Sequence, residues 1–308
     1  MKKKYCLLSN DVETTSIWHN TLRDETGYKV LTEGMPLLLD LYEKYDVKST
    51  FYFTGYIAKL YPEIVKMVVP YGHEVGSHGL SHTKKNGFDV MPLEKQIRHL
   101  KTSKDIIENI IGEEIISFRA PALRVNNDTA IALAETGYKI DSSVASQRFD
   151  MFMSFGSLKK LNWLTAPRLP YRTSKDSLFK KGDGQIIEVP LSASLIPYLS
   201  TTMRIFPYFT AIQRRIMAFE ASKTGKPIVF DTHPNEFIDE SYEKRQINKR
   251  SKNIVASFLQ DTVRSKLKVK NLGIKGVKIY EREIKYFHKH KFEFCTIKEF
   301  CKQKGLLK

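Results

Sequence analysis

The sequence predicts an α/β fold organised around a largely parallel β-sheet. Three observations support this prediction: short apolar runs that end in polar residues recur along the chain, amphipathic helical stretches separate them, and 308 residues suffice to bury the core of one large domain. A barrel and a doubly wound sheet both fit this alternation. In either arrangement the polar residues that follow the strands collect at the carboxyl edge of the sheet, where functional groups gather.

The predicted elements follow one another from the amino terminus. Apolar or β-branched runs predict strands at residues 5–8, 48–55, 72–78, 115–118, 138–142, 185–191, 227–233 and at the start of 292–301. Apolar residues at helical spacing predict helices at residues 32–45, 61–67, 92–111, 127–136, 205–222 and at the end of 292–301. Residues 149–172 are aromatic and basic without a clear period, and we expect them to form a loop over the site.

The charge of the chain indicates an anionic partner. Fifty Lys and Arg residues against 34 Asp and Glu give a net charge of +16, which suits nucleic acid, a membrane surface or a phosphorylated substrate. Residues 241–279 hold eleven Lys and Arg residues and two acidic ones, and we interpret them as a basic insertion within a single domain of residues 1–308. This segment is either a solvated face or a binding surface for anionic lipid headgroups or a pyrophosphate-linked carrier. No nucleic-acid motif accompanies it, so nucleic acid is not expected as a partner.

The cysteines and the amino terminus predict a cytoplasmic protein. Cys6, Cys295 and Cys301 form neither a disulfide framework nor a Cys-rich zinc pattern. The apolar run at residues 5–8 is too short for the core of a signal peptide, and no run is long enough to span a membrane. We therefore expect a cytoplasmic location, and the basic charge favours a peripheral association with the inner face of the membrane.

Three histidines crowd into the glycine-rich stretch at residues 72–82. His78 and His82 are four residues apart, so on a helical turn both imidazoles project from one face and can bind the same divalent cation. His73 is too far from this pair to share the ion, and we interpret it as structural. The histidine pair predicts a metal site.

Further polar residues at the predicted strand ends complete a hydrolytic site. The full set is Asp11, Glu13, His78, His82, Arg119, Asp141 and His233. Zinc binds neutral imidazole and carboxylate groups and keeps one position for water, so two histidines and one carboxylate suffice. Asp11 and Glu13 are two residues apart and point to one face of an extended segment, so that one can bind metal while the other acts as a base. His233 would protonate a leaving amine or stabilise a tetrahedral intermediate, and Arg119 with Asp141 would form a charged pair that orients the base.

These residues resemble the five motifs of the polysaccharide deacetylases with NodB homology, carbohydrate esterase family four. The segments that carry the resemblance, in family order, are residues 9–13, 72–82, 118–121, 138–143 and 230–234. The resemblance implies a distorted (β/α) barrel of seven parallel strands and a divalent metal that serves to remove an acetyl group from a sugar. It further implies that Asp11 is the base, that Glu13, His78 and His82 are metal ligands, that Arg119 and Asp141 are supporting residues, and that His233 is the acid. Many members have two adjacent aspartates in the first motif, whereas Val12 separates Asp11 from Glu13 here, so the division between base and ligand stays open.

The sequence thus predicts a zinc-dependent carbohydrate deacetylase. We expect an N-acetyl group as its target, on a lipid-linked or nucleotide-linked sugar used in surface polysaccharide assembly. Trp18, His19 and Pro121 are candidates for substrate binding, although loop aromatic residues more often serve packing. The alternatives are an amidohydrolase for a non-sugar amide on the same scaffold, and a catalytically silent module that binds saccharide or membrane.

Overall fold

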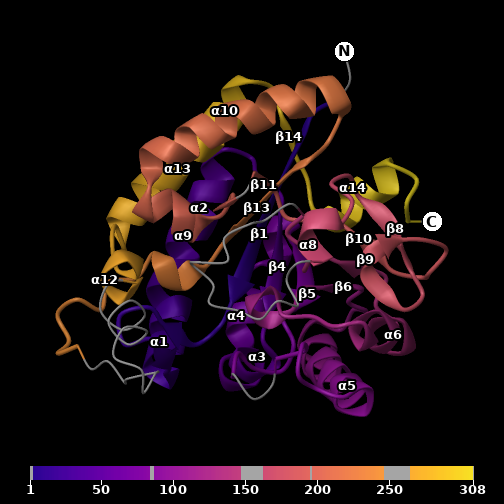
Figure 1. Cartoon of the computed structure of the whole chain (residues 1–308). Coiled ribbons are helices and arrows are strands. Elements are labelled where there is room, and N and C mark those ends of the chain that lie inside the picture. Colours follow the sequence, from indigo (N-terminus) through magenta and orange to yellow (C-terminus); the bar gives the residue numbers. More distant parts are fainter. Residues whose placement is uncertain (1–2, 84–86, 147–161, 195, 246–263, 308) are drawn as a thin grey trace, which may run out of the picture.

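A curved sheet surrounded by helices forms the centre of the molecule (Figure 1). The computed structural model describes residues 3–83, 87–146, 162–194, 196–245 and 264–307. Among the helices in these ranges, none combines the length and the apolar character that crossing a bilayer requires.

The main sheet contains ten strands within the described residues. Seven of them are consecutive neighbours that run parallel, in the order β13 (Ile228–Thr232), β1 (Tyr5–Val12), β4 (Ser49–Phe53), β5 (Glu74–Ser77), β6 (Ser117–Phe118), β7 (Ile140–Asp141) and β10 (Ile187–Glu188). Three others extend the sheet: β14 (Glu293–Phe294) pairs with β1, and β8 (Tyr171–Ser174) and β9 (Ser177–Lys181) form an antiparallel hairpin next to β10. Two small hairpins lie outside it, β2 (Thr15–Ser16) with β3 (Thr21–Leu22) and β11 (Ala193–Ser194) with β12 (Ile196–Pro197).

The predicted seven parallel strands are therefore present, and the prediction falls short only in the total number of strands. The hairpin β8–β9 begins inside residues 149–172, which we expected to be a loop, and α8 (Asn162–Thr165) also lies there. Residues 149–161 of that predicted loop lie outside the described part. Aromatic and basic residues without an obvious period concealed β8, whose exposed and buried positions alternate over only four residues.

The segment after β10 draws the two ends of the parallel sheet together. The Leu191 amide donates to the Val144 carbonyl at 2.9 Å, and the next amide, of Ser192, donates to the carbonyl of Val229 in β13 at 3.0 Å. Leu199 then forms a parallel bridge with Asp231. The sheet consequently curls into a distorted (β/α) barrel, in agreement with the expected fold class.

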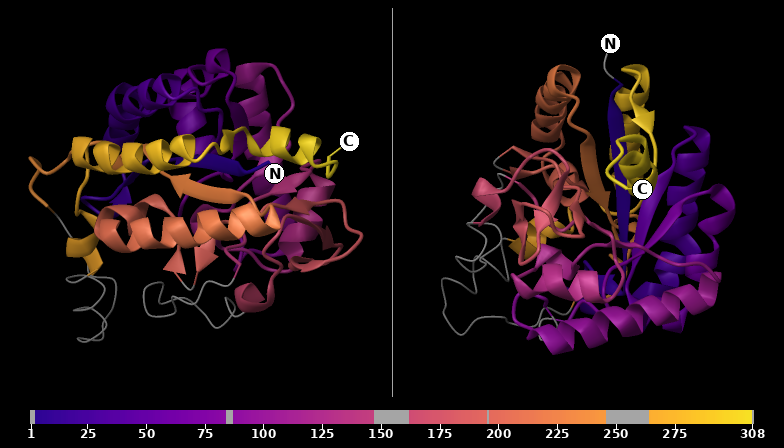
Figure 2. Two further views of the ribbon diagram at one scale, coloured as in Figure 1. Left: turned by 90° about the horizontal axis from the view of Figure 1, so that it is seen from above. Right: turned by 90° about the vertical axis from the view of Figure 1, so that its right-hand side faces the viewer.

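Helices cover the outside of the barrel. They are α1 (Asp24–Lys29), a π-helical turn at Val30–Gly34, α2 (Met35–Lys44), α3 (Gly55–Leu60), α4 (Pro62–Lys66), α5 (Leu93–Ile111), α6 (Asp128–Glu135), α9 (Ser200–Ile205), α10 (Pro207–Thr224), α12 (Arg264–Lys268), α13 (Ile274–Lys289) and α14 (Ile297–Gln303). The helix predicted at residues 32–45 is longer than expected, because α1, the π-helical turn and α2 follow without a break. Seen from above, α13 lies between α2 and α10 (Figure 2).

The described part of the basic segment 241–279 is attached to the barrel. Arg204 of α9 is fully buried, and its Nη1 donates to the carbonyls of Lys268 at 3.0 Å and Lys270 at 2.6 Å. Residues 274–279 form the start of α13, which buries Tyr280, Ile284 and Phe287 against the barrel. Residues 246–263 lie outside the described part, and the interpretation of 241–279 as an insertion stays a prediction.

Candidate active site

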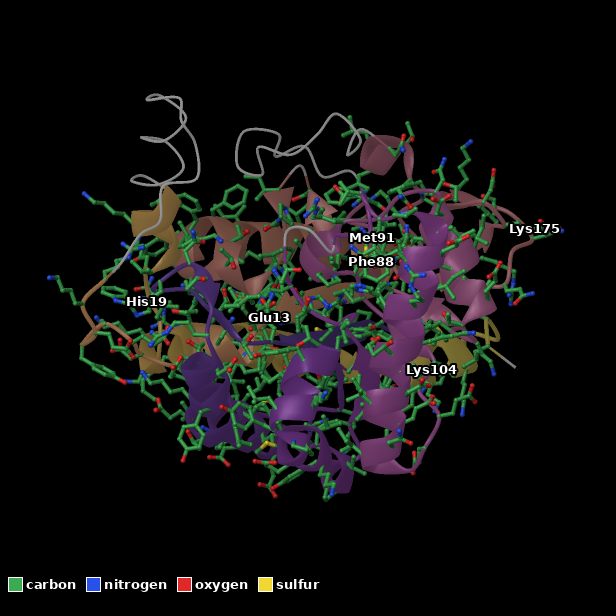
Figure 3. All side chains as sticks on the ribbon, turned by 90° about the horizontal axis from the view of Figure 1, so that it is seen from below. Glu13, His19, Phe88, Met91, Lys104 and Lys175 are labelled. Atoms are coloured by element: carbon green, nitrogen blue, oxygen red, sulfur yellow. The ribbon has the colours of Figure 1, made fainter. Side chains whose placement is uncertain are left out.

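Several of the predicted site residues lie at the carboxyl edge of the parallel strands. Asp11 is the penultimate residue of β1 and Glu13 comes directly after this strand, while His78 follows β5, Arg119 follows β6 and His233 follows β13. Because these strands are parallel, the residues that follow them share one face of the barrel. From below, Glu13 lies near the middle of this face, whereas His19 lies toward its periphery (Figure 3).

Glu13, His78 and His82 form a group that could hold a metal ion. One potential ligand atom from each residue lies within 4.8 Å of the others, and Nε2 of His82 is 3.7 Å from Oε2 of Glu13. The backbone brings the two histidines together at Gly79, whose φ of +69° suits a residue without a Cβ. A Cβ there would also lie 3.2 Å from the ring of Phe88.

The chemistry of this group fits a divalent cation. Nδ1 of His78 lies 2.9 Å from the backbone carbonyl of Arg119, and because a carbonyl only accepts, Nδ1 carries the proton and Nε2 is free to coordinate. Burial lowers the pKa of His78, which favours the neutral imidazole that a metal ion requires. Oε2 of Glu13 is buried and has no hydrogen-bond partner among the described residues, a costly state that a cation would relieve. The His82 side chain is 28% exposed, so the group opens to solvent.

Arg119 organises the carboxylates beside this group. It is completely buried, and its guanidinium lies 4.6 Å from the centre of the Tyr52 ring. Nη1 donates to Oδ1 of Asp231 at 2.7 Å, to Oδ1 of Asp11 at 3.2 Å and to Ser9 Oγ at 2.7 Å. Nε and Nη2 donate to the carbonyl and the hydroxyl of Ser142, each at 2.9 Å. All three nitrogens are thus bonded, and the charge is held between two carboxylates.

Asp11 and Asp231 respond to this arrangement in opposite directions. Burial would raise the pKa of Asp11, but His78, Arg119 and His233 together lower it, so Asp11 is ionised at neutral pH. Burial, followed by the charge of Asp11, raises the pKa of Asp231 to about 7. The sequence analysis did not select Asp231. Its position two residues before His233, on the same face of β13, was the signal that could have identified it.

His233 faces both aspartates. Its Nε2 lies 3.9 Å from Oδ2 of Asp11 and 3.9 Å from Oδ2 of Asp231. Burial would lower the pKa of His233, but Asp231, Glu236 and Asp11 outweigh this and raise it. One potential ligand atom from each of Asp11, Asp231 and His233 also lies within 4.8 Å of the others. The Arg119 guanidinium already neutralises this group, so its chemistry favours proton transfer over cation binding.

Asp141 does not form the predicted pair with Arg119. The carboxylates bonded to Arg119 are Asp11 and Asp231, whereas Asp141 accepts from the hydroxyl of Ser143 at 2.6 Å and from its amide at 3.2 Å. Asp141 is paired in register with Glu188 of the neighbouring strand β10. Burial and the adjacent Asp141 raise the pKa of Glu188 well above its usual range, so a proton is retained in this buried pair.

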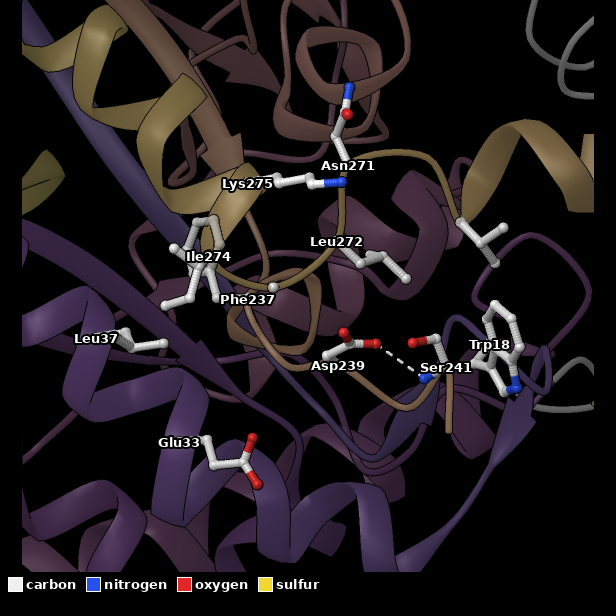
Figure 4. A pocket seen from close by; sticks show the side chains of 12 residues that line it. Trp18, Glu33, Leu37, Phe237, Asp239, Ser241, Asn271, Leu272, Ile274 and Lys275 are labelled. Atoms are coloured by element: carbon white, nitrogen blue, oxygen red, sulfur yellow. Dashed lines mark hydrogen bonds between the residues drawn. The ribbon is translucent and has the colours of Figure 1, made fainter. Parts of the chain in front are cut away.

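Two of the three predicted substrate-binding residues lie apart from this group. Trp18 donates to the backbone of Glu243 at 3.0 Å and, with Phe237 and Lys275 among others, lines a separate pocket to which none of the three candidate metal ligands contributes (Figure 4). His19 lies 3.0 Å from the Glu243 carboxylate. Pro121, in contrast, is 3.4 Å from where a Cβ of Gly79 would stand, so it borders the histidine turn.

Comparison with known proteins finds a family that part of this chain resembles. Residues 21–140 match the family model described as polysaccharide deacetylase. The resemblance to the polysaccharide deacetylases is therefore confirmed. The matched range includes His78, His82 and Arg119, while Asp11, Glu13 and His233 lie outside it and are brought to the same face by the parallel strands.

Similar proteins are found by sequence and by fold. A peptidoglycan deacetylase of Helicobacter pylori is 32% identical over 116 residues, which is 38% of this chain and 39% of the relative. The chain thus spans about two fifths of that relative. A probable polysaccharide deacetylase from Pseudomonas aeruginosa PAO1 has a TM-score of 0.58 at 14% identity, covering 96% of this chain and 90% of the other. The Puue allantoinase reaches a TM-score of 0.60 at 13% identity, with 96% and 89% coverage, so the fold is shared.

Proposed function

We propose that this chain is a metal-dependent hydrolase that removes an acetyl group from a carbohydrate. The observation that supports this most strongly is the group of Glu13, His78 and His82 next to the Asp11 carboxylate, which is bonded by Arg119 and has a lowered pKa. The similarity to the Helicobacter pylori peptidoglycan deacetylase supports the class of reaction. We expect zinc in this group, because its two imidazoles and one carboxylate are ligands that zinc prefers in hydrolytic sites.

The proposed reaction divides the work among the residues of this chain. A divalent cation held by Glu13, His78 and His82 would act as a Lewis acid toward the acyl oxygen of the substrate. Asp11 accepts the proton of the attacking water, since its lowered pKa keeps it ionised. His233 donates a proton from Nε2 to the leaving amine as the carbon–nitrogen bond breaks, which yields acetate and a free amino sugar. The raised pKa of His233 keeps that proton available near neutral pH.

We extend the proposal to the substrate, which we expect to be an N-acetyl sugar carried on a lipid or a nucleotide. The protein would act on this sugar at the cytoplasmic face of the membrane. The net charge of +16 supports an anionic carrier or surface. Deleting residues 241–279 would be a poor test, because Arg204 would lose the carbonyls of Lys268 and Lys270 while remaining buried.

The test combines metal analysis with acetate release. The purified protein should contain about one equivalent of zinc and release acetate from at least one N-acetylated oligosaccharide, lipid-linked sugar or nucleotide sugar. The matched variants are Asp11→Asn, which should retain metal without activity, and His78→Ala, which should lose both. Cleavage of a non-sugar amide without acetate would indicate an amidohydrolase instead. Absence of metal and of both activities would indicate a silent binding module and would refute the proposal.

A further inference from the structure

Helix α10 exposes an apolar stripe along its length. Its buried side consists of Thr210, Gln213, Met217, Ala218 and Ala221. The opposite side carries Tyr208 at 88% exposure, Ile212 at 58%, Ile216 at 57% and Phe219 at 66%. Spacings of four, four and three residues place these side chains on one face of the helix. Four large apolar side chains in a continuous row on an exposed helix indicate a surface that is covered in use.

The charges around this stripe are positive. Arg215 and Lys223 are the exposed charged residues of α10. The acidic residue of the helix, Glu220, is bonded at the side of the stripe by Arg168 at 2.6 Å and by Lys226 at 3.4 Å. The apolar face of α10 is therefore bordered by cations that have no acidic partner among the described residues, as in helices that lie at a membrane interface.

Helix α13 adds a basic stripe next to α10. The two helices lie side by side (Figure 2) and are joined by Arg214, which contacts Glu283 at 2.8 Å and lies 4.2 Å from the centre of the Tyr286 ring. The exposed face of α13 carries cations at spacings of three or four residues, namely Lys275, Lys278, Arg282, Lys285 and Lys289. Of these, Lys285 is 3.3 Å from Glu281, which also binds Lys44. The combined surface is an apolar row flanked by a basic row.

We propose that α10 and α13 form a docking surface for an anionic lipid bilayer. The apolar row of α10 would enter the boundary between headgroups and acyl chains, while the cations of α13 would contact anionic headgroups. A second copy of the chain is the less favourable occupant, because the net charge of +16 and the basic row would bring like charges together.

The surface begins on the side of the barrel that carries the candidate active site. Thr201 of α9, just before α10, donates to Glu236 at 2.8 Å, and the amide of Gly273, just before α13, donates to the Glu236 carbonyl at 3.0 Å. Glu236 is three residues after His233. Docking would therefore bring the starts of the two helices, and with them the segment after His233, to the border of the membrane, a geometry that suits a lipid-linked substrate. This consequence rests on the proposed function, whereas the docking itself does not.

Vesicle flotation tests the docking without reference to catalysis. The probes are vesicles of phosphatidylcholine alone and of phosphatidylcholine with phosphatidylglycerol. The full chain should float with the anionic vesicles and about tenfold less with the neutral ones. The double variant Ile216→Glu/Phe219→Glu should lose about tenfold or more of the anionic binding, because both side chains would carry charge into the interface. Lys278→Gln/Arg282→Gln should weaken binding most at low salt, where screening is small.

The control variant is Val90→Glu, which places the same charge on a 56% exposed apolar residue before α5. It should float like the original chain, and circular dichroism should show all three variants folded. Equal flotation of the Ile216→Glu/Phe219→Glu variant would overturn the proposal. So would equal binding to neutral vesicles, or a dimer in sedimentation that this variant dissociates while no form binds vesicles.

Discussion

Replacing Arg119 by methionine removes the charge that holds Asp11 and Asp231 together. The methionine side chain keeps much of the length and apolar volume of arginine but donates no hydrogen bond. Five hydrogen bonds are lost, at 2.7 to 3.2 Å, and two buried carboxylates are left facing each other without their cation. Both Asp11 and Asp231 would then have to be protonated to remain buried.

The structure sets the size of the expected effect. Removing one partner of a buried ion pair costs about 3–5 kcal/mol, because the remaining charge is uncompensated. At roughly 2 °C per kcal/mol for a chain of this size, the melting temperature should fall by at least about 6 °C. The second variant Arg119→Met/Asp231→Asn should recover part of this loss, since it also removes one of the abandoned charges.

Thermal unfolding and the pH dependence of acetate release together measure the effect. The pKa of Asp11 is lower in the folded protein than in the unfolded chain. The ionised Asp11 therefore contributes stability that is present above about pH 4 and is lost as pH falls through the folded pKa. Without Arg119 the burial of Asp11 is unopposed by that charge, its pKa rises, and the acid limb of kcat/KM moves to higher pH. Arg119→Lys, which retains the charge, should shift this limb less. An unchanged melting temperature and an unchanged acid limb in Arg119→Met would refute the role assigned to Arg119.

Three further predictions concern the neighbouring groups. Removal of metal by a chelator should abolish acetate release, and added zinc should restore it in the original chain but not in His78→Ala. Metal analysis and an acetate assay measure both effects. Activity that survives complete metal removal would contradict the proposed metal site. Asp231→Asn should lower the pKa of His233, because Asp231 contributes most to raising it. The alkaline limb of the pH–rate profile should therefore move to lower pH. Titration of the histidine followed by NMR measures the pKa directly. Glu188→Gln should raise the melting temperature relative to the original chain as pH increases. Because the pKa of Glu188 is raised in the folded protein, protonated Glu188 contributes stability that is complete below about pH 4 and is lost as pH rises toward its folded pKa. Glutamine keeps the hydrogen-bonding groups of the protonated acid at every pH. Melting temperatures of the two proteins that change in parallel from pH 5 to 9 would rule this out.

The polar residues at the strand ends can be predicted from the sequence, because both their side-chain chemistry and their place after an apolar run are visible within a few residues of chain. Each apolar run ends at a polar residue, and the parallel arrangement alone brings residues such as Asp11, His78 and His233 to one edge. The spacing of His78 and His82 likewise depends on four residues of chain. These parts of the candidate site could be inferred without knowing the order of the strands.

The pairing of Arg119 could not be inferred in the same way. Arg119 follows β6 and bonds Asp11 of β1 and Asp231 of β13, which are not its neighbours in the sheet. Asp141 of the adjacent strand β7 looked like the natural partner, yet that side chain is bonded by Ser143 and faces Glu188 instead. Such contacts cross the interior of the barrel, and they depend on how strongly the sheet curls. Sequence periodicity carries no information about that curvature.

The geometry also bears on the division of labour between Asp11 and Glu13. Both carboxylates are buried and both lie near a histidine, but their hydrogen-bond partners differ. Oδ1 of Asp11 is held by Arg119 at 3.2 Å, and this bond reduces the charge that Asp11 could offer a cation. Oε2 of Glu13 has no donor among the described residues, so its desolvation is uncompensated until a cation binds. A ligand gains most from a metal when nothing else neutralises it, whereas a base must be ionised before the metal arrives. By that criterion we propose Glu13 as the ligand and Asp11 as the base, and the outcome that would reverse this assignment is an Asp11→Asn variant that purifies without metal.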